Sequence, residues 1–271
     1  MEERVSISIS EGVADVRLVR ADKMNALDQA MFEALVAATD RLSKDKSVRV
    51  VVLSGEGRAF CAGLDMGRFA AMKEKGGNGI PGGENRDLTK RTHGQANFPQ
   101  QAVWGWRQLP VPVIAAVHGV AFGGGFQLSL GADMRFLSPD ARMSVMEIKW
   151  GLVPDMSGIV LMRGLIRDDV ARELTWTGRI FSGEEAVQMG LATRVAADPH
   201  ADALALAREI ATKNPHAIRA GKRLLNLALS DATVDQIFLE ETREQVRLIG
   251  SANQVEAVVA NLENRAPAFA D

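Results

Sequence analysis

The sequence predicts an α/β protein in which strands and helices alternate over residues 1–200. Runs rich in β-branched and other apolar residues recur at 48–53, 113–117 and 134–137, and a helical pattern begins near Phe126. Beyond residue 200 the strand signal disappears. Strand, helix and strand in alternation favour parallel βαβ units.

The N-terminal segment predicts a hairpin followed by a helix. Residues 5–10 alternate apolar and polar side chains, and residues 13–19 form a second strand candidate. Glu11-Gly12 between them is typical of a tight turn. Asp28 is then a plausible helix cap. The apolar residues that follow it fall on one helical face: Met31, Leu35, Ala38 and Leu42.

The segment 68–108 gives no clear element. Residues 73–83 are rich in glycine and charge, which breaks a helix and predicts a mobile surface loop. Order returns at 110–112, where Pro-Val-Pro precedes the strand at 113–117.

Residues 201–271 are predicted to form a separate helical region. Helical spacing covers 201–212, 215–229, 233–250 and 253–264. Apolar faces come from Leu204, Leu206, Ile210, Leu224, Leu225 and Leu227. We expect these faces to pack on the α/β core of residues 1–200 or on a neighbouring subunit, which makes an oligomerisation region of the tail.

Composition excludes several classes of protein. The 271 residues carry 32 basic and 34 acidic side chains, which are interspersed and give a net charge of −2. A nucleic-acid binder usually shows a basic stripe, so no nucleic-acid partner is expected. The single Cys61 allows no intrachain disulfide, which fits a reducing, cytoplasmic compartment. We expect no signal peptide and no membrane span, because no basic n-region and no run of 18 apolar residues occurs. The four histidines lie far apart, so no metal site is expected.

Two glycine-containing turns follow predicted strands. Residues 60–65 come after the strand that ends at Leu53, and Gly123-Gly124-Gly125 comes after the strand that ends at Val117. Glycine lets a backbone approach a ligand closely, and a loop that enters a helix points free N–H groups outward. Two such donors can hold a developing oxyanion, at roughly 3 kcal/mol each in the transition state. A glycine triplet is also common in close-packed turns. Leu128 stands where a dinucleotide fingerprint needs its last glycine.

Two acidic residues lie in the segment 144–158. Glu147 is flanked by apolar residues, and if its side chain points inward, burial raises its pKa toward neutrality and makes it a usable base or acid. A surface strand residue is the alternative for Glu147. Asp155 lies in a turn before a predicted helix, where an N-cap role is the alternative to a chemical one.

Together these segments resemble the crotonase (enoyl-CoA hydratase/isomerase) superfamily. The resemblance extends over most of the chain, and several independent motifs occur in the family's order. They are Asn25-Ala26-Leu27, Ala62-Gly63-Leu64-Asp65, the run from Val117 to Gly125, Gly151-Leu152-Val153-Pro154, and Thr177-Gly178-Arg179 followed by Ala186 and Gly190-Leu191. The fold that this resemblance implies is a spiral of ββα repeats with a helical C-terminal region, assembled as a homotrimer or a dimer of trimers.

The resemblance also implies roles for particular residues. The N–H groups of Ala62 and Gly124 are expected to form the oxyanion hole for an acyl-CoA thioester. The coenzyme A portion of the substrate is expected to lie along Lys23, Ala26, Leu64, Asp65 and Met66, and no further cofactor is implied. Phe98, Trp104 and Trp106 either line the acyl pocket or pack in the core.

Gln127 marks a departure from the best-known hydratases of this superfamily. Those enzymes resemble this chain at Glu147 but carry a second glutamate at the position of Gln127. An amide can hold water but cannot take its proton. Dienoyl-CoA isomerases look similar at Glu147 and at Asp155, eight residues further on, although they too carry an acid at the position of Gln127.

The resemblance therefore favours a double-bond shift, with Glu147, Asp155 and Gln127 as the catalytic group. Glu147 would move a proton at one carbon, Asp155 would serve a second position or orient Glu147, and Gln127 would bind water or substrate. Hydration of a trans-2-enoyl-CoA is the alternative. Three further hypotheses rank below isomerisation and hydration. They are an aroyl-CoA dehalogenase with His93 and Trp150 near the ring, a CoA-thioester hydrolase or decarboxylase, and a non-catalytic acyl-CoA binder.

Overall fold

A computed structural model describes residues 3–67 and 87–271, and the loop expected at 73–83 lies outside these ranges. The main sheet of the described residues has the strand order β1-β2-β3-β4-β6-β9. Its strands are β1 (Val5–Ser10), β2 (Val13–Leu18), β3 (Val50–Gly55), β4 (Val113–Val117), β6 (Met134–Leu137) and β9 (Arg194–Val195). Only β1 is antiparallel to its neighbour among these strands, so the predicted parallel βαβ arrangement is confirmed.

The N-terminal hairpin and the helix after it are also as predicted. Glu11 and Gly12 connect β1 to β2 with φ values of 51° and 79°, the left-handed conformation of a tight hairpin turn. Helix α1 (Gln29–Lys44) follows, and the side chain of Asp28 accepts a hydrogen bond from Met31 N at 2.8 Å. That bond satisfies one of the helix's free N–H groups.

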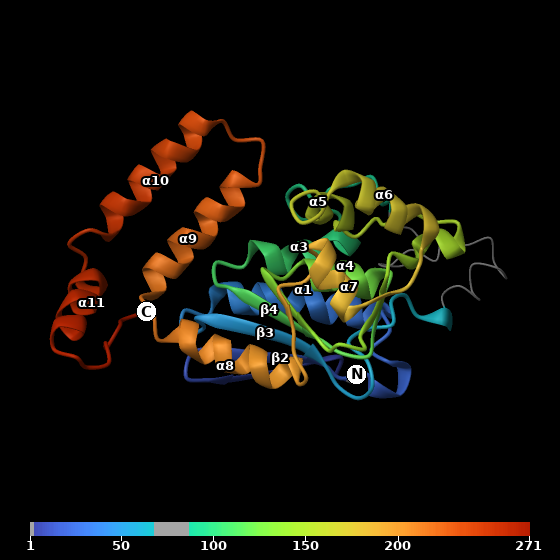
Figure 1. Cartoon of the computed structure of the whole chain (residues 1–271), viewed down its shortest axis with the longest axis horizontal. Coiled ribbons are helices and arrows are strands. Elements are labelled where there is room, and N and C mark those ends of the chain that lie inside the picture. The colour runs from blue at the N-terminus through green and yellow to red at the C-terminus, as the bar shows by residue number, and fades with distance from the viewer. Residues whose placement is uncertain (1–2, 68–86) are drawn as a thin grey trace.

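Alternation along the strands sends side chains to two apolar layers. Val51 and Leu53 face the larger core, which includes residues of α1 and α3 (Phe98–Gln108). Val50 and Val52 point the other way, against the alanines of α8 (Pro199–Ala211). Figure 1 shows α8 on one side of the sheet and α1, α3 and α4 (Gly124–Leu130) on the other. Helix α8 thus belongs with the sheet, and the part of the chain that lies away from it begins at α9.

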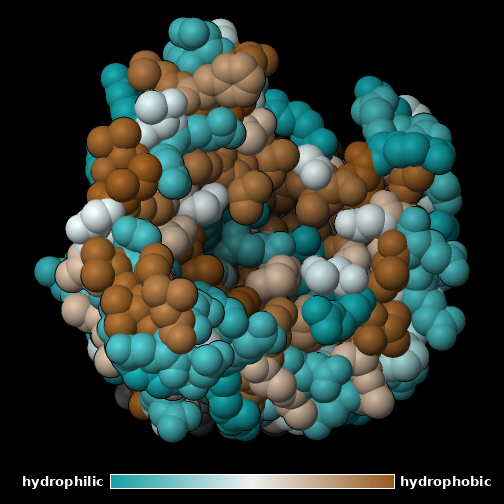
Figure 2. Space-filling view, turned by 60° about the vertical axis from the view of Figure 1, so that its left-hand side comes forward, coloured by the Kyte–Doolittle hydropathy of each residue, from teal (hydrophilic) through white to brown (hydrophobic). Residues whose placement is uncertain are grey.

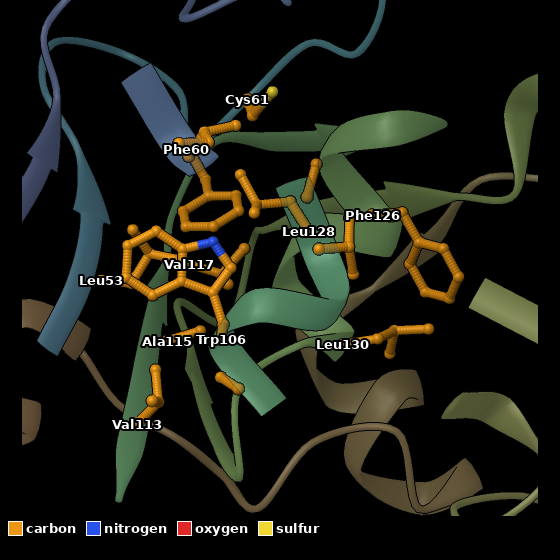
Figure 3. Close-up of a cluster of buried hydrophobic side chains, with 14 of the residues drawn as sticks. Leu53, Phe60, Cys61, Trp106, Val113, Ala115, Val117, Phe126, Leu128 and Leu130 are labelled. Carbon is orange, nitrogen blue, oxygen red and sulfur yellow. The ribbon is translucent and has the colours of Figure 1, made fainter. Parts of the chain in front are cut away.

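Helix α3 occupies the end of a segment where no regular element was predicted. Asn97 caps it in a reciprocal arrangement with Gln100, and Pro99 lies in its first turn. Trp106 is fully buried within the core cluster that Figure 3 shows, and its Nε1 donates to the carbonyl of Ala102 at 3.0 Å. Trp106 is therefore a core residue, so the alternative of a pocket-lining role for it is wrong.

A second, smaller sheet supports the residues that follow. It has the order β5-β7-β8, formed by β5 (Val120–Phe122), β7 (Arg142–Ser144) and β8 (Phe181–Ser182). The remaining short helices of the described residues are η1 (Ala21–Lys23), η2 (Met146–Trp150), α5 (Gly158–Met162), α6 (Asp168–Thr177) and α7 (Gly183–Met189). Because β5 directly precedes α4 and β7 directly precedes η2, this sheet places both segments side by side.

Helices α9 (Pro215–Ala228), α10 (Val234–Leu248) and α11 (Ala252–Leu262) extend away from the sheet. Large apolar side chains are exposed along them, including Leu225, Leu229, Val234, Phe238, Leu239, Val246, Val255, Val258 and Leu262. On the face that Figure 2 shows, apolar side chains gather around a hollow. In residues 3–67 and 87–271, no helix combines the length and apolarity that crossing a bilayer requires.

Lys222 of α9 ties this tail to the sheet. Its side chain is 6% exposed, and its Nζ donates to the carbonyl of Val111 and to Oδ2 of Asp133, both at 2.8 Å. Oδ2 of Asp133 also accepts a hydrogen bond from Val113 N, at the start of β4. Burial lowers the pKa of Lys222, against the opposing effect of the Asp133 carboxylate.

Candidate active site

The two glycine-containing turns lie against each other. Cys61 N donates to Val120 O at 3.0 Å, and Phe122 N donates to Cys61 O at 3.1 Å, which joins the turns as a short parallel pair. Gly63 has a φ of 87°, and a Cβ there would lie 2.5 Å from Phe122 O and 3.6 Å from Gly124 N. A residue with a side chain cannot approach so closely, so Gly63 brings its loop next to the start of α4.

The N–H of Ala62 is not a free donor. It is bonded to the carbonyl of Met24 at 2.9 Å, so the expected oxyanion-hole role of Ala62 does not agree with the structure. Sequence reasoning placed the donor two residues too early. The direction of each N–H depends on which residue pairs with the loop, and the sequence gives no sign of that pairing.

Leu64 supplies a free N–H instead. Leu27 pairs with Leu64, because Leu27 N donates to Gly63 O at 2.8 Å and Asp65 N donates to Leu27 O at 3.2 Å. In a parallel pair of this kind, the N–H of Leu64 itself points to the opposite side. Gly124 is the first residue of α4, where an N–H has no partner within the helix. Neither N–H is hydrogen-bonded within the described residues.

Glu147 lies beside these donors and is buried. It is 9% exposed, and a Cβ on Gly123 would lie 3.4 Å from its Oε1. Oε1 accepts a hydrogen bond from Gln127 Nε2 at 2.6 Å. Oε2 is buried without a hydrogen-bond partner in the part of the chain that the structure describes. The surface-strand alternative for Glu147 is therefore wrong, and Oε2 is the oxygen left for a ligand.

The pKa of Glu147 is raised. Burial is the main cause, the hydrogen bond from Gln127 opposes it, and the negative charge of Asp155 adds to it. A carboxyl in such surroundings accepts and releases protons closer to neutral pH than an exposed one does.

Gln127 is held by the protein on both ends of its carboxamide. The residue is fully buried, and its Oε1 accepts hydrogen bonds from Met156 N and Gly158 N, each at 2.9 Å. Because an amide oxygen cannot donate, these two donors establish that the Nε2 end faces Glu147. The partners of Gln127 are thus protein groups, where the sequence led us to expect water or substrate.

Asp155 lines the same region without capping a helix. The N-cap residue of α5 is Ser157, and no side chain caps that helix, so the capping alternative for Asp155 is wrong. Its side chain is exposed to solvent, although protein atoms surround it on most sides. Burial raises the pKa of Asp155. Glu147 and Asp155 are therefore two carboxyl groups that interact electrostatically and both hold protons more readily than usual.

The residues expected along coenzyme A lie on two adjoining loops. The Leu27–Leu64 pair joins the loop that holds Lys23 and Ala26 to the loop that holds Asp65 and Met66. Ala26 is 8% exposed, and Met66 is 60% exposed.

Arg20 braces these loops and was missed by sequence reasoning. Its Nη1 donates to Ala26 O at 3.0 Å and to Asp65 Oδ2 at 2.5 Å. Partial burial opposes ionisation of Asp65, but the hydrogen bond and charge of Arg20 outweigh it and hold the pKa of Asp65 below its usual range. Asp65 thus serves first as a structural partner of Arg20.

The sequence and the fold match known proteins over nearly the whole chain. The family model for enoyl-CoA hydratase/isomerase matches residues 8–271. A probable enoyl-CoA hydratase of Mycobacterium leprae is 31% identical, over 98% of each chain. A mitochondrial Delta(3,5)-Delta(2,4)-dienoyl-CoA isomerase of Mus musculus is 30% identical, over 95% of this chain and 79% of its own. The crystal structure of an enoyl-CoA hydratase from Bacillus anthracis superposes with a TM-score of 0.86 at 27% identity, covering 98% of this chain and 99% of its own.

The chain belongs to the enoyl-CoA hydratase/isomerase family of the crotonase superfamily, and it is an enzyme of that family. The predicted fold class is confirmed by this match. The comparisons include both hydratases and dienoyl-CoA isomerases, so the choice between these reactions depends on the residues of the site.

Proposed function

We propose that this enzyme shifts double bonds in an acyl-CoA thioester, with a dienoyl-CoA as the preferred substrate class. One observation carries the proposal: Gln127 is fully buried, its Oε1 is held by Met156 N and Gly158 N and its Nε2 by Glu147, and a carboxamide in this position cannot take a proton from a nucleophilic water. The second carboxyl group of the site is Asp155, at a different place from the second carboxylate of a two-glutamate hydratase. Two carboxyl groups at these two places suit proton transfer along a carbon chain.

The proposed reaction begins with the thioester oxygen bound between the N–H groups of Leu64 and Gly124. These donors stabilise the negative charge that develops when a proton leaves the carbon next to the thioester. Glu147, which lies against Gly123, removes that proton through its free Oε2. The electron pair delocalises along the conjugated chain, and Asp155 in its protonated form delivers a proton to the distal carbon. The substrate loses one proton and gains one, so no water is consumed.

Hydration of a trans-2-enoyl-CoA is the second candidate. The free Oε2 of Glu147 supports it, because one buried carboxylate can still deliver a proton to the enolate that water addition creates. We expect this reaction to be slow, since Gln127 cannot act as the second base.

Product analysis in D₂O with three CoA esters separates these possibilities. The esters are a 3,5-dienoyl-CoA, a 3-enoyl-CoA and a trans-2-enoyl-CoA, and the products are followed by NMR. We expect the dienoyl ester to become the 2,4-isomer fastest. Fast formation of a 3-hydroxyacyl-CoA, with little isomerisation, would rule the proposal out in favour of hydration. Release of free CoA or CO₂ would indicate a hydrolase or decarboxylase.

Substitution of each carboxyl group tests its role separately. Glu147→Gln is expected to lower turnover by a factor of about 100 or more on every ester while CoA-ester binding persists. Asp155→Asn is expected to abolish dienoyl isomerisation selectively. Arg20→Lys serves as a control, because it alters the brace of the CoA loops and is expected to change KM more than kcat. Unchanged dienoyl turnover in Asp155→Asn would contradict its assigned role.

We also propose that the acyl-CoA lies along the Lys23–Ala26 and Leu64–Met66 loops, and that residues 201–271 form the contact of a trimer-based assembly. The pairing of Leu27 with Leu64, which makes one surface of the two loops, supports the first proposal. The exposed apolar side chains of α9, α10 and α11 support the second.

A further inference from the structure

Gln127 connects three separate segments around the carboxyl pair. It lies on α4, its Nε2 donates to Glu147 on η2, and its Oε1 accepts from Met156 and Gly158 on the turn into α5. Asp155 directly precedes Met156 on that turn. A single side chain therefore joins the segment that holds one carboxyl group to the segment that holds the other.

The packing around Gln127 leaves it little room to move. A Cβ on Gly158 would lie 2.7 Å from Gln127 Oε1 and 2.8 Å from its Cγ, so the turn is pressed directly onto this side chain. The neighbouring Ser157 adopts a φ of 70°, which is uncommon for a residue with a side chain. The turn is thus held in a particular shape around the carboxamide.

The hydrogen bonds of Gln127 also make the two oxygens of Glu147 unequal. Oε1 faces an N–H donor that cannot turn around, because the other end of the carboxamide is held by two backbone N–H groups. Oε1 must therefore remain an acceptor, and a proton on Glu147 must sit on Oε2, which has no partner within the described residues.

We propose that Gln127 is a positioning residue that presents Oε2 of Glu147 to the substrate and sets the place of Asp155 relative to it. This inference rests on the proposed proton-transfer function of the site. In the two-glutamate arrangement, the residue at this position takes part in the reaction. Here it holds the carboxyl groups of Glu147 and Asp155 at fixed positions relative to each other. In this proposal Gln127 acts through Glu147 and through the turn that carries Asp155.

The charges near Glu147 are few, which makes its titration interpretable. Helix α4 (Gly124–Leu130) carries no ionisable side chain, and Asp155 is the charged group that acts on the pKa of Glu147. Lys149 of η2 lies over the ring of Trp150. The charged residues of α6, which packs against η2, are exposed and paired with arginines: Asp168 with Arg172, Asp169 with Arg167, and Glu173 with Arg179.

The experiment compares Gln127→Met with wild type in two measurements. The first is an infrared titration of the Glu147 carboxyl group in the enzyme without substrate, with Glu147→Gln as the blank. The second is the pH dependence of kcat/KM on a dienoyl-CoA. Methionine fills the same volume but cannot donate, so we expect the pKa of Glu147 to be higher by about 1, since a hydrogen bond to a charged group is lost. We expect the acid limb of the kcat/KM profile to move to higher pH by the same amount. We also expect kcat to fall by roughly tenfold or more while KM stays nearly constant.

Ser129→Ala is the matched control on the same helix. Ser129 is also fully buried, and its hydroxyl donates to Phe126 O within α4, away from Glu147. It is expected to leave the titration and the acid limb unchanged. If Gln127→Met does not fold, Gln127→Glu replaces it, because two carboxyl groups at that separation must share a proton and raise the pKa of the pair.

An unchanged Glu147 titration in a folded Gln127 variant would overturn the proposal, and so would an equal shift in Ser129→Ala. The infrared titration needs no substrate, so it tests the role of Gln127 even if the wild-type enzyme does not isomerise dienoyl-CoA. In that case the proposed function fails while the positioning of Glu147 is judged separately.

Discussion

At the scale of single residues, the site depends on a carboxyl group whose neutral, protonated form is favoured by burial in the fold. Glu147 is 9% exposed, its pKa is raised mainly by burial, and one of its oxygens has no protein partner in the described chain. Ionised Glu147 therefore lowers the stability of the folded state, which is the usual relation between a reactive buried group and its fold. The same burial makes it a stronger base than an exposed carboxylate.

This relation predicts a pH-dependent gain in stability for Glu147→Gln. A raised pKa in the folded state means that folding favours the protonated form of Glu147. The loss of stability that ionised Glu147 causes is therefore absent below the unfolded pKa of about 4.3 and complete above the folded pKa. We expect Glu147→Gln to raise the free energy of unfolding by on the order of 1 kcal/mol near pH 8 and by little near pH 4. Urea denaturation at both pH values measures this, with the exposed Glu33→Gln as control. An equal gain at both pH values would show that ionisation is not its source.

The sequence predicts those residues of the site that can be identified from their neighbours along the chain. Glu147, Asp155 and the glycine triplet were identified from their immediate neighbours and from the family's motif order. The free donor was placed at Ala62, although the structure leaves the N–H of Leu64 free. Neighbouring N–H groups point in different directions along an extended segment, so the correct donor depends on the long-range pairing of Leu27 with Leu64.

At the scale of elements, the close contact between two turns decides where the donors lie. A Cβ on Gly125 would fall 2.2 Å from the carbonyl oxygen of Cys61, which is backbone and cannot swing aside. The start of α4 therefore rests directly on the loop that carries Leu64. Any separation of these two elements also separates the N–H groups of Leu64 and Gly124.

Gly125→Ala is accordingly expected to damage both stability and catalysis. The clash should cost about 1–3 kcal/mol in the free energy of unfolding and lower kcat/KM by roughly tenfold or more as the donors move apart. Thermal unfolding and steady-state kinetics measure the two effects. Gly221→Ala on α9 is the control, because a Cβ there meets nothing within 4 Å. Full activity in Gly125→Ala would show that the contact does not set the oxyanion hole.

The elements themselves were predicted where apolar periodicity is regular. The strands of the hairpin and helix α1 were identified in this way, whereas α3 was not. Its capping signals, Asn97, Pro99 and Gln100, are present in the sequence, but Gly105 lowers the helix propensity of the segment, and the preceding segment has no regular pattern. Gly105 is needed for packing, since a Cβ there would lie 2.7 Å from Thr39 Oγ1 on α1. A tertiary contact thus overrides local helix propensity.

At the scale of the whole molecule, the tail exposes more apolar surface than a lone chain normally leaves uncovered. Phe238 is 63% exposed and Val246 is 67% exposed on α10, and Leu225 is 69% exposed on α9. Such a surface is typical of a permanent contact between subunits. This is the physical basis for the proposal that the helices of residues 201–271 which lie away from the sheet, α9 to α11, form the contact of an assembly.

Phe238→Glu tests that assignment. A carboxylate in the centre of an apolar contact must be desolvated without a partner, so we expect the assembly to dissociate into smaller species. Sedimentation velocity over a range of protein concentrations measures this. Ser43→Glu, which adds the same charge at the exposed end of α1, is expected to leave the assembly intact. If Phe238→Glu sediments as the wild type does, α10 does not form the contact.

The ion pair of Lys222 and Asp133 joins the tail to the main sheet. Asp133 Oδ2 also receives a hydrogen bond from Val113 at the start of β4, and the opposite end of β4 leads toward the glycine triplet. Peeling α9 from the sheet would break this ion pair and the hydrogen bond from Lys222 Nζ to Val111 O, and it would leave the partly buried Asp133 carboxylate without its ammonium partner, which is unfavourable. Lys222 therefore opposes detachment of the tail as an independent arm. Because Asp133 also binds the first residue of β4, we expect detachment of the tail to disturb the strand that leads to the glycine triplet, and so to lower the fraction of molecules with a competent site.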